Sequence, residues 1–445
     1  MKLTNPHILC VNPWIHDFAA FDFWAKPLGL LGLASILRHH GLNVSFIDCL
    51  DRFHPEAGTN IKVLADGRGP YRKEEICLPR GLENIKKRFS RYGIAREWFR
   101  HDLKRIEKPD LILVTSLMTY WAPGVKETIS VIKEIYPEIP LILGGIYASL
   151  CREHAEQNSM ADLVVTGSGE DVLHKLVKDY TNFSFTPSFD SKDLDSLPWP
   201  ALDMVSHLSY APIITSRGCP FSCDYCASSF LQPKFQRRSP DSVFQEIEYW
   251  HSRYNLYNFA FYDDAFLINP AKYAMPLLEK IIESGMDIAF HTPNALHIRE
   301  ITKQSADLMF KAGFKTIRLG LETADFSSSR HYDVKVKENE FSDAVKNLRN
   351  AGFVPEQIGA YLLCALPGQQ LSDVESSIMA VKKNGIKPVL AYYTPIPHTA
   401  MWESAVESSS FDLEKDPVFT NNALFPCLDK KIGIKSISRL KNLTG

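Results

Sequence analysis

Three cysteines, Cys219, Cys223 and Cys226, stand within eight positions of the sequence, in the stretch TSRGCPFSCDYCASS. Three residues separate the first two and two residues separate the last two, so their thiolates can meet at one metal centre. A structural zinc site takes four Cys or His ligands, and the next histidine, His251, is 25 residues further on. Iron–sulfur clusters usually have four cysteine ligands, so three would leave one iron open to a substrate. The spacing favours such a cluster, with a zinc knuckle or a disulfide clasp as the alternatives.

The composition is that of an ordinary globular protein, with 45% apolar and 23% charged residues and a net charge of −2. This balance argues against a general attraction to nucleic acid or to an anionic membrane. The start, MKLTNPHILCVNPW, does not resemble a signal peptide, and no apolar run approaches the roughly 18 residues of a spanning helix. We therefore expect a cytoplasmic protein. The isolated cysteines are expected to be buried, reduced thiols: Cys10, Cys49, Cys77, Cys151, Cys364 and Cys427.

Residues 1–181 alternate short apolar runs with helical patterns, and glycine or proline bounds most of them. This alternation predicts a doubly wound, Rossmann-like parallel sheet. Ligands bind at the C-terminal strand ends of such sheets, and here those ends are rich in small and polar residues. The predicted strands begin near residues 7, 43, 110, 140 and 161, and the predicted helices cover 29–41, 123–136 and 149–157.

A second series of strand and helix patterns begins at residue 211 and ends near 400. It contains about six units, which predicts a partial (β/α)6 barrel. Residues 182–210, with three prolines and little periodicity, are predicted to link the two domains, and 401–445 form a C-terminal extension. The predicted strands of the barrel are 211–220, 258–266, 286–294, 314–322, 358–368 and 387–395.

The pattern C-x3-C-x2-C, with the aromatic Tyr225 directly before its last cysteine and a strand directly before the loop, resembles the radical S-adenosylmethionine (SAM) superfamily. This resemblance implies that the three cysteines hold a [4Fe–4S] cluster whose fourth iron binds SAM. One-electron reduction would then cleave SAM to a 5′-deoxyadenosyl radical, which abstracts hydrogen from a substrate. The resemblance further implies a set of SAM contacts along the barrel: Tyr225, Asp263, Asp264, Gly320, Glu322 and Gly368.

Each of these residues could instead have a purely structural role. The two acids, Asp263 and Asp264, could cap a helix, and Glu322 could pair with the nearby Arg318. Gly368 follows a proline and could be an ordinary turn residue, while Tyr225 could fill the core.

The first domain resembles the cobalamin-binding subgroup of the same superfamily, through PLGLLGLASILRHHG, SLMTYW, LGGIYAS, VTGSGE and the stretch LDSLPWPALD. The motif D-x-H-x-x-G, whose histidine binds cobalt in many cobalamin proteins, is absent from the sequence. The resemblance therefore implies base-off cobalamin without a histidine ligand, with Met118 or Tyr120 beneath the corrin ring. The alternative is a fold that has lost the cofactor. The implied cobalamin contacts are Ser116, Leu117, Met118, Thr119, Tyr120, Gly144, Gly145, Gly167 and Glu170.

The favoured function is a cobalamin-dependent radical SAM methyltransferase that acts on an unactivated carbon of a small molecule or peptide. Its expected partner is a one-electron reductant such as flavodoxin or ferredoxin. The alternatives are a cyclase or rearrangement enzyme with the same cofactors, a radical SAM enzyme acting on RNA, and a non-catalytic cobalamin or redox sensor. The Lys- and Arg-rich interval 68–105 is the only argument for RNA, and its acidic residues dilute the charge.

Overall fold

The protein is described by a computed structural model that covers residues 5–326, 336–429 and 434–445. It consists of two compact units. The first comprises Met1–Ser209 together with Lys415–Val418, and the second comprises Tyr210–Glu414 together with Phe419–Gly445. Residues 182–209, which the sequence predicts to be a linker, instead belong to the first unit. Their side chains Phe183, Phe185 and Phe189 pack against its hydrophobic core.

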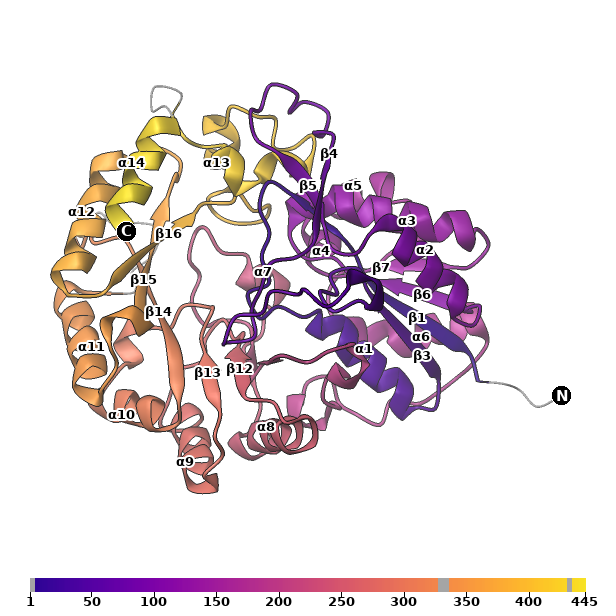
Figure 1. Ribbon diagram of the computed structural model, residues 1–445, viewed down its shortest axis with the longest axis horizontal. Helices are drawn as coiled ribbons and strands as arrows, with labels where there is room; N and C mark the ends of the chain where they lie inside the picture. The colour runs from indigo at the N-terminus through magenta and orange to yellow at the C-terminus, as the bar shows by residue number, and fades with distance from the viewer. Residues whose placement is uncertain (1–4, 327–335, 430–433) are drawn as a thin grey trace. The chain divides into compact units, whose positions relative to one another are not determined.

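The first unit contains a five-stranded parallel sheet in the order β3-β1-β6-β7-β8. Because consecutive residues of a strand face opposite sides, β1 contributes Leu9 and Val11 to one apolar core and Ile8 and Cys10 to another. Helices cover both faces of this sheet, as the predicted doubly wound fold requires (Figure 1). The strands are β1 (His7–Asn12), β3 (Asn43–Asp48), β6 (Leu111–Val114), β7 (Leu141–Leu143) and β8 (Leu163–Val164). The helices are α1 (Leu28–His39), α2 (Arg96–Arg105), α3 (Ala122–Ile135), α4 (Ile146–Leu150), α5 (Arg152–Asn158) and α6 (Gly169–Thr181).

A small antiparallel sheet takes two of its three strands from the polar stretch 51–107, to which the sequence pattern assigns no element. It consists of β2 (Ile15–Asp17), β5 (Phe89–Tyr92) and β4 (Lys73–Ile76). Several arginines of this region are paired with acids. Arg91 contacts Glu74 and Glu127, and Arg96 contacts Glu134. These pairs favour the interpretation of interval 68–105 as a solvated surface with structural ion pairs.

The second unit contains six parallel strands in sequence order, with β9 and β16 at the two edges, so the predicted partial barrel is confirmed. The rings of Phe261, Phe290 and Phe314 pack against one another on one face of this sheet. On the opposite face, the two ring nitrogens of His291 make hydrogen bonds of 3.0 Å to the side chains of Asn258 and Thr316. The strands are β9 (Ala211–Ile213), β12 (Asn258–Phe261), β13 (Ala289–His291), β14 (Phe314–Glu322), β15 (Ile358–Cys364) and β16 (Lys387–Tyr392).

Helices follow the strands of the second unit, and Figure 1 shows α9 to α12 along one face of its sheet. The C-terminal extension, which the sequence pattern could not assign, contains two further helices. The helices are α8 (Pro240–Tyr254), α9 (Ala274–Ser284), α10 (Lys303–Lys311), α11 (Glu338–Ala351), α12 (Leu371–Lys383), α13 (Trp402–Ser408) and α14 (Ile434–Thr444).

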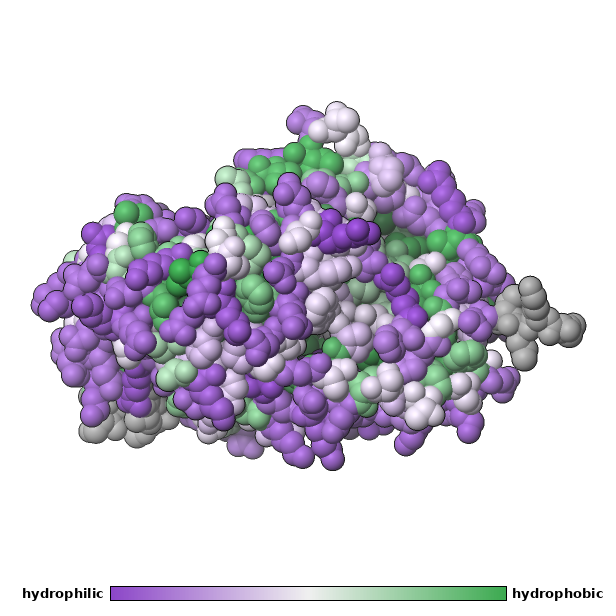
Figure 2. Space-filling view, turned by 90° about the horizontal axis from the view of Figure 1, so that it is seen from below, coloured by the Kyte–Doolittle hydropathy of each residue, from purple (hydrophilic) through white to green (hydrophobic). Residues whose placement is uncertain are grey.

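The isolated cysteines are mostly buried, and burial raises the pKa of Cys10 to about 12 and that of Cys364 to about 11. The prediction that all six are buried is wrong for Cys77, which is exposed, and for Cys151, which is half-buried. On the face shown in Figure 2, hydrophilic residues cover most of the area and apolar residues form scattered groups. Within the described part of the chain, no helix is both long and apolar enough to cross a membrane.

Candidate functional site

The three cysteines lie in a hairpin directly after β9. Its strands β10 (Ser216–Arg217) and β11 (Gln236–Arg237) pair in antiparallel fashion, and the short helix α7 (Ser228–Leu231) follows the last cysteine. Gly218 begins the loop with a φ of 79°, and a Cβ there would lie 2.9 Å from the carbonyl oxygen of Gln232. Only glycine fits this position without moving the backbone.

The cysteine loop is half-buried at Cys219, Cys223 and Cys226. The amide of Cys226 donates to the carbonyl of Cys223 at 2.9 Å, and the amide of Ser228 donates to the Cys226 sulfur at 3.5 Å. Among the residues that the structure covers, no three His, Cys, Asp or Glu side chains are grouped closely enough to hold a metal ion. The fold therefore brings the cysteines to one hairpin, and their role as ligands stays a prediction. Tyr225, also half-buried, lies in the same loop.

The two acids predicted to contact SAM follow β12 directly. The Asp263 carboxylate is 3% exposed and accepts hydrogen bonds from the Thr215 amide (3.0 Å), the Thr215 hydroxyl (2.7 Å) and the Ser216 hydroxyl (2.6 Å). Burial raises the pKa of Asp263, and these donors oppose that shift. Asp264 is exposed, and its Oδ2 accepts from the Ser228 hydroxyl at 2.9 Å. Both acids therefore contact the hairpin, and neither caps a helix.

A segment after β16 also reaches the hairpin. The amide of Met401 donates to the carbonyl of Asp224 at 2.9 Å. The ring of His398 stacks on Phe230, with centroids 4.1 Å apart and an interplanar angle of 5°. His398 has a φ of 66°, a left-handed conformation that is uncommon for residues other than glycine. This segment therefore supports the backbone between Cys223 and Tyr225.

The neighbouring strands β14 and β15 both end in left-handed backbone at a residue other than glycine. Glu322 has a φ of 65° and Ala365 a φ of 68°. The register between the two strands shifts between Gly320 and Glu322. A Cβ on Gly320 would come within 3.2 Å of the Ala295 Cβ, whereas Gly368 has a φ of 68° and open space around it. Strained backbone of this kind clusters at functional sites, which makes Glu322 a candidate ligand. Gly368 adopts its left-handed φ without strain, so its contact with SAM stays a prediction.

Ser377 of α12 supports the turn after Glu322, and sequence reasoning missed it. Its hydroxyl accepts from the Ala324 amide at 2.9 Å and donates to the Asp373 carbonyl at 2.8 Å. The Thr323 hydroxyl is 3.4 Å away. The only sequence signal for this role is a serine on the apolar face of a helix, because the contact joins residues more than fifty positions apart.

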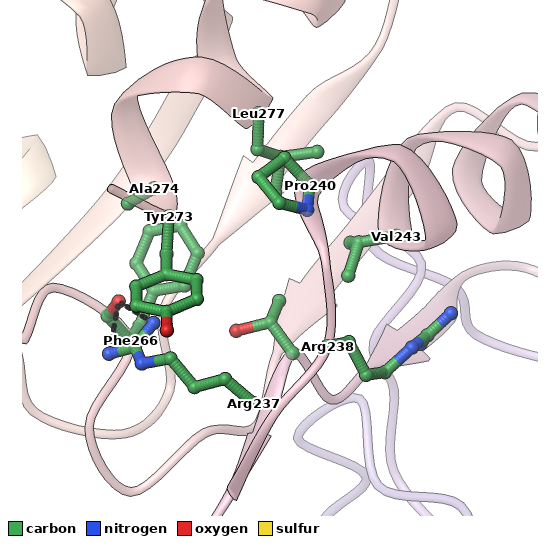
Figure 3. Close-up of a pocket in the computed structure, with 9 residues that line it drawn as sticks. Arg237, Arg238, Pro240, Val243, Phe266, Tyr273, Ala274 and Leu277 are labelled. Carbon is green, nitrogen blue, oxygen red and sulfur yellow. Dashed lines mark hydrogen bonds between the residues drawn. The ribbon is translucent and has the colours of Figure 1, made fainter. Parts of the chain in front are cut away.

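A cavity of about 10 Å³, the room of one water molecule, lies beside the base of the hairpin and is lined by Thr215, Arg237, Phe266 and Tyr273, among others (Figure 3). It is far too small for SAM. Its significance lies in Arg237, whose guanidinium donates to the carbonyls of Ala265 at 2.8 Å and Ile268 at 2.6 Å. No sequence motif singles out this arginine.

In the first unit, the strand ends of β6 and β7 meet at Ser116 and Gly145. The Ser116 hydroxyl donates to the Gly144 carbonyl at 2.7 Å, and the Ile146 amide donates to the Ser116 carbonyl at 2.9 Å. Gly145 has a φ of 98°, and a Cβ there would lie 2.3 Å from the Ser116 carbonyl oxygen. Backbone and small residues therefore bring these two loops into direct contact.

The predicted cobalamin contacts divide into exposed and buried residues. Leu117 and Met118 are each 42% exposed, so they present apolar surface at the end of β6, while Thr119 and Tyr120 are buried. Of the two residues suggested to shield the lower face of cobalamin, Met118 is thus exposed and Tyr120 is packed into the protein. Near β8, Gly167 is left-handed with open space around it, and the Glu170 carboxylate accepts from the Ser168 hydroxyl at 2.7 Å.

Comparison with known families identifies both domains. Residues 213–381 match the radical SAM superfamily, and residues 101–177 match the B12 binding domain. An uncharacterized methyltransferase, PH0819, of Pyrococcus horikoshii is 24% identical over 71% of this chain and 74% of its own. An anaerobic magnesium-protoporphyrin IX monomethyl ester cyclase of Cereibacter sphaeroides is 25% identical over 70% of this chain, which spans 55% of that protein.

Solved structures show the same fold. The radical SAM methyltransferase TsrM of Kitasatospora setae superposes with a TM-score of 0.65 at 15% identity, over 91% of this chain and 76% of TsrM. The cobalamin-dependent SAM radical enzyme OxsB superposes with a TM-score of 0.59 at 14% identity, over 94% of this chain and 58% of OxsB.

The fold and site define an α/β protein in which a doubly wound unit precedes a partial barrel with a three-cysteine hairpin. The chain carries a radical SAM domain at residues 213–381, preceded by a B12-binding domain at residues 101–177. These domains imply a [4Fe–4S] cluster, SAM and cobalamin as cofactors. The residues present fit this set, because the hairpin offers three thiols on a loop closed by Gly218, and the Ser116–Gly145 contact leaves apolar Leu117 and Met118 exposed at a ligand-binding edge.

Proposed function

We propose that this radical SAM enzyme is a cobalamin-dependent methyltransferase that acts on an unactivated carbon of a small molecule or peptide. The observation that carries the proposal is the C-x3-C-x2-C hairpin after the first strand of a six-stranded barrel, on a chain with a B12-binding domain. The similarity to PH0819 and to the fold of TsrM supports methyl transfer.

When bound, the cluster and cobalamin would supply the electron that cleaves SAM and the carrier of its methyl group. The protein's part is to bind and orient them. Cys219, Cys223 and Cys226 would hold the cluster, while Glu322 at the end of β14 and Gly368 in the turn after β15 would contact SAM. Leu117 and Met118 would lie against the corrin ring. Flavodoxin or ferredoxin would serve as the reductant.

The first test is anaerobic purification with cobalamin supplied, followed by iron, sulfide and cobalt analysis. We expect about four irons and near-stoichiometric cobalt. The single variants Cys219→Ala, Cys223→Ala and Cys226→Ala should each lose nearly all iron and all release of 5′-deoxyadenosine from SAM. Cys77→Ala is the matched control, because Cys77 is exposed and far from the hairpin in sequence, and it should retain both. Zinc in place of iron would contradict the proposal.

A second candidate is a radical SAM cyclase with the same cofactors, which the cyclase of Cereibacter sphaeroides favours at 25% identity. SAM labelled with deuterium in its methyl group separates the two functions. A methyltransferase transfers the label to its product, whereas a cyclase releases 5′-deoxyadenosine and an unlabelled product. Iron without cobalt would contradict both.

A further inference from the structure

The segment that follows β12, residues 263–268, contacts the cysteine hairpin at three points: where β10 begins, in the loop just after the last cysteine, and on β11, which pairs with β10. Asp263 contacts Thr215 and Ser216, where the chain leaves β9 for the hairpin. Asp264 contacts Ser228, two residues after the last cysteine. The carbonyls of Ala265, Phe266 and Ile268 contact Arg237 of β11.

At the start of the hairpin, hydrogen bonds from Thr215 and Ser216 use one oxygen of the Asp263 carboxylate. Its Oδ1 accepts from three donors, the Thr215 amide and the hydroxyls of Thr215 and Ser216, and its Oδ2 lies 3.2 Å from the same amide. A carboxylate oxygen has room for about two such bonds, so Oδ1 is saturated. The remaining acceptor capacity lies on Oδ2, and because the side chain is only 3% exposed, a ligand could reach that oxygen only by displacing the residues that bury it.

The contact in the loop of the hairpin places Asp264 one side chain away from a cysteine. Its Oδ2 accepts from the Ser228 hydroxyl at 2.9 Å, and that hydroxyl oxygen is 3.2 Å from the Cys226 sulfur. The Ser228 amide also donates to this sulfur. Asp264 therefore fixes the rotamer of a serine that touches Cys226 twice.

The third contact joins a charged side chain to backbone. The Arg237 guanidinium donates to the carbonyls of Ala265, Phe266 and Ile268. It lies 4.6 Å from the centroid of the Tyr273 ring (Figure 3) and 5.0 Å from that of Phe235. Ser216 pairs with Arg237 across the hairpin, so this anchor and Asp263 hold opposite strands at the same level.

We propose that residues 263–268 form a clamp that sets the conformation of the cysteine hairpin, and that Asp263 and Asp264 are positioning residues of this clamp instead of SAM ligands. The proposal rests on the proposed function only in assigning the hairpin to a cluster. It replaces the sequence-based expectation that these acids bind SAM.

Hydrogen exchange of the metal-free protein tests the clamp without any cofactor. Asp263→Asn turns an acceptor into a donor facing the Thr215 amide, and Asp264→Asn weakens the bond to Ser228. We expect peptides within 215–237 to exchange at least about threefold faster in both variants, with the larger effect for Asp263→Asn. Ser216→Ala and Ser228→Ala remove single hydroxyls and should act in the same direction without unfolding the protein. Ser229→Ala is the matched control, because Ser229 is exposed.

Reconstituted protein supplies the second readout. Variants of the clamp should lose iron to a chelator at least about threefold faster than wild type, while samples matched for iron content bind SAM with unchanged affinity. Normal exchange and iron retention in Asp263→Asn and Asp264→Asn, with weaker SAM binding, would overturn the clamp and leave the proposed function intact. Faster exchange in a protein that binds no iron would overturn the proposed function and leave the clamp intact.

Discussion

At the strand ends of the first unit, Gly145 lies against the backbone of Ser116, whereas at those of the second unit the carboxylate of Asp263 holds the cysteine hairpin. The first arrangement depends on the absence of a side chain, and the second depends on charged and hydroxyl groups. A large ring cofactor needs shape and close backbone approach, while a metal cluster needs its ligands held at fixed positions. The way each loop is held thus matches the ligand that we assign to it.

The largest effect should come from placing a side chain where the first unit has none. Gly145→Ala would bring a Cβ to 2.3 Å from the Ser116 carbonyl oxygen at a φ of 98°, so the two loops must separate. We expect cobalamin affinity, measured by absorbance titration, to fall at least about tenfold. Gly29→Ala in α1 is the control, because Gly29 is exposed, is not a predicted cobalamin contact, and a Cβ there would meet nothing within 4 Å. Equal affinities of the two variants would contradict the role of this contact.

A smaller effect should come from removing one hydroxyl in the second unit. Ser377→Ala deletes the acceptor of the Ala324 amide beside Glu322, and a lost buried hydrogen bond costs about 1 kcal/mol. We expect SAM affinity, measured by calorimetry, to fall about fivefold, and Glu322→Gln to lower it further. The adjacent Ser376→Ala should be silent, because Ser376 is exposed on the same helix. A loss in Ser376→Ala as large as that in Ser377→Ala would contradict this role.

The smallest effect concerns His154, a titratable residue of α5 in the first unit. His154 accepts or donates at 2.7 Å to the Tyr147 hydroxyl on α4, and its Nε2 is 3.8 Å from Asp416. Burial lowers the pKa of His154 below its ordinary value of 6.5, against the attraction of Asp416. The neutral ring therefore contributes stability above pH 6.5, and this contribution is lost as the pH falls through the folded-state pKa.

We expect the thermal midpoint of wild type to drop about 2 °C more than that of His154→Gln between pH 7.5 and pH 5.5. Glutamine keeps a polar partner for Tyr147 without titrating in this range. Parallel pH curves for the two proteins would show that His154 stays in one protonation state.

The sequence predicted β14 at its observed bounds, Phe314–Glu322. It likewise predicted six barrel strands, since glycine and proline bound each apolar run. It placed the cysteines on a loop after the first strand, where the structure has them. These successes share one property, which is that the signal lies within a few consecutive residues.

Contacts between residues far apart in the chain could not be predicted from the sequence. Asp263 and Asp264 were expected to bind SAM or cap a helix, and their partners Thr215 and Ser228 lie 48 and 36 positions away. The aromatic stretch after β16 gave no sign that Met401 would bond Asp224. The polar stretch 51–107 gave no sign of β4 and β5, because these four-residue strands, KEEI and FSRY, show no regular alternation of apolar and polar residues.

The segment Lys415–Val418 belongs to the first unit although the residues on both sides of it belong to the second. Neither unit is therefore one continuous stretch of chain. During synthesis, Asp416 emerges only after the whole six-stranded sheet, so the surroundings of His154 are completed after that sheet has been made. A gene fusion that exchanged only the first 209 residues would leave these four residues of the first unit behind.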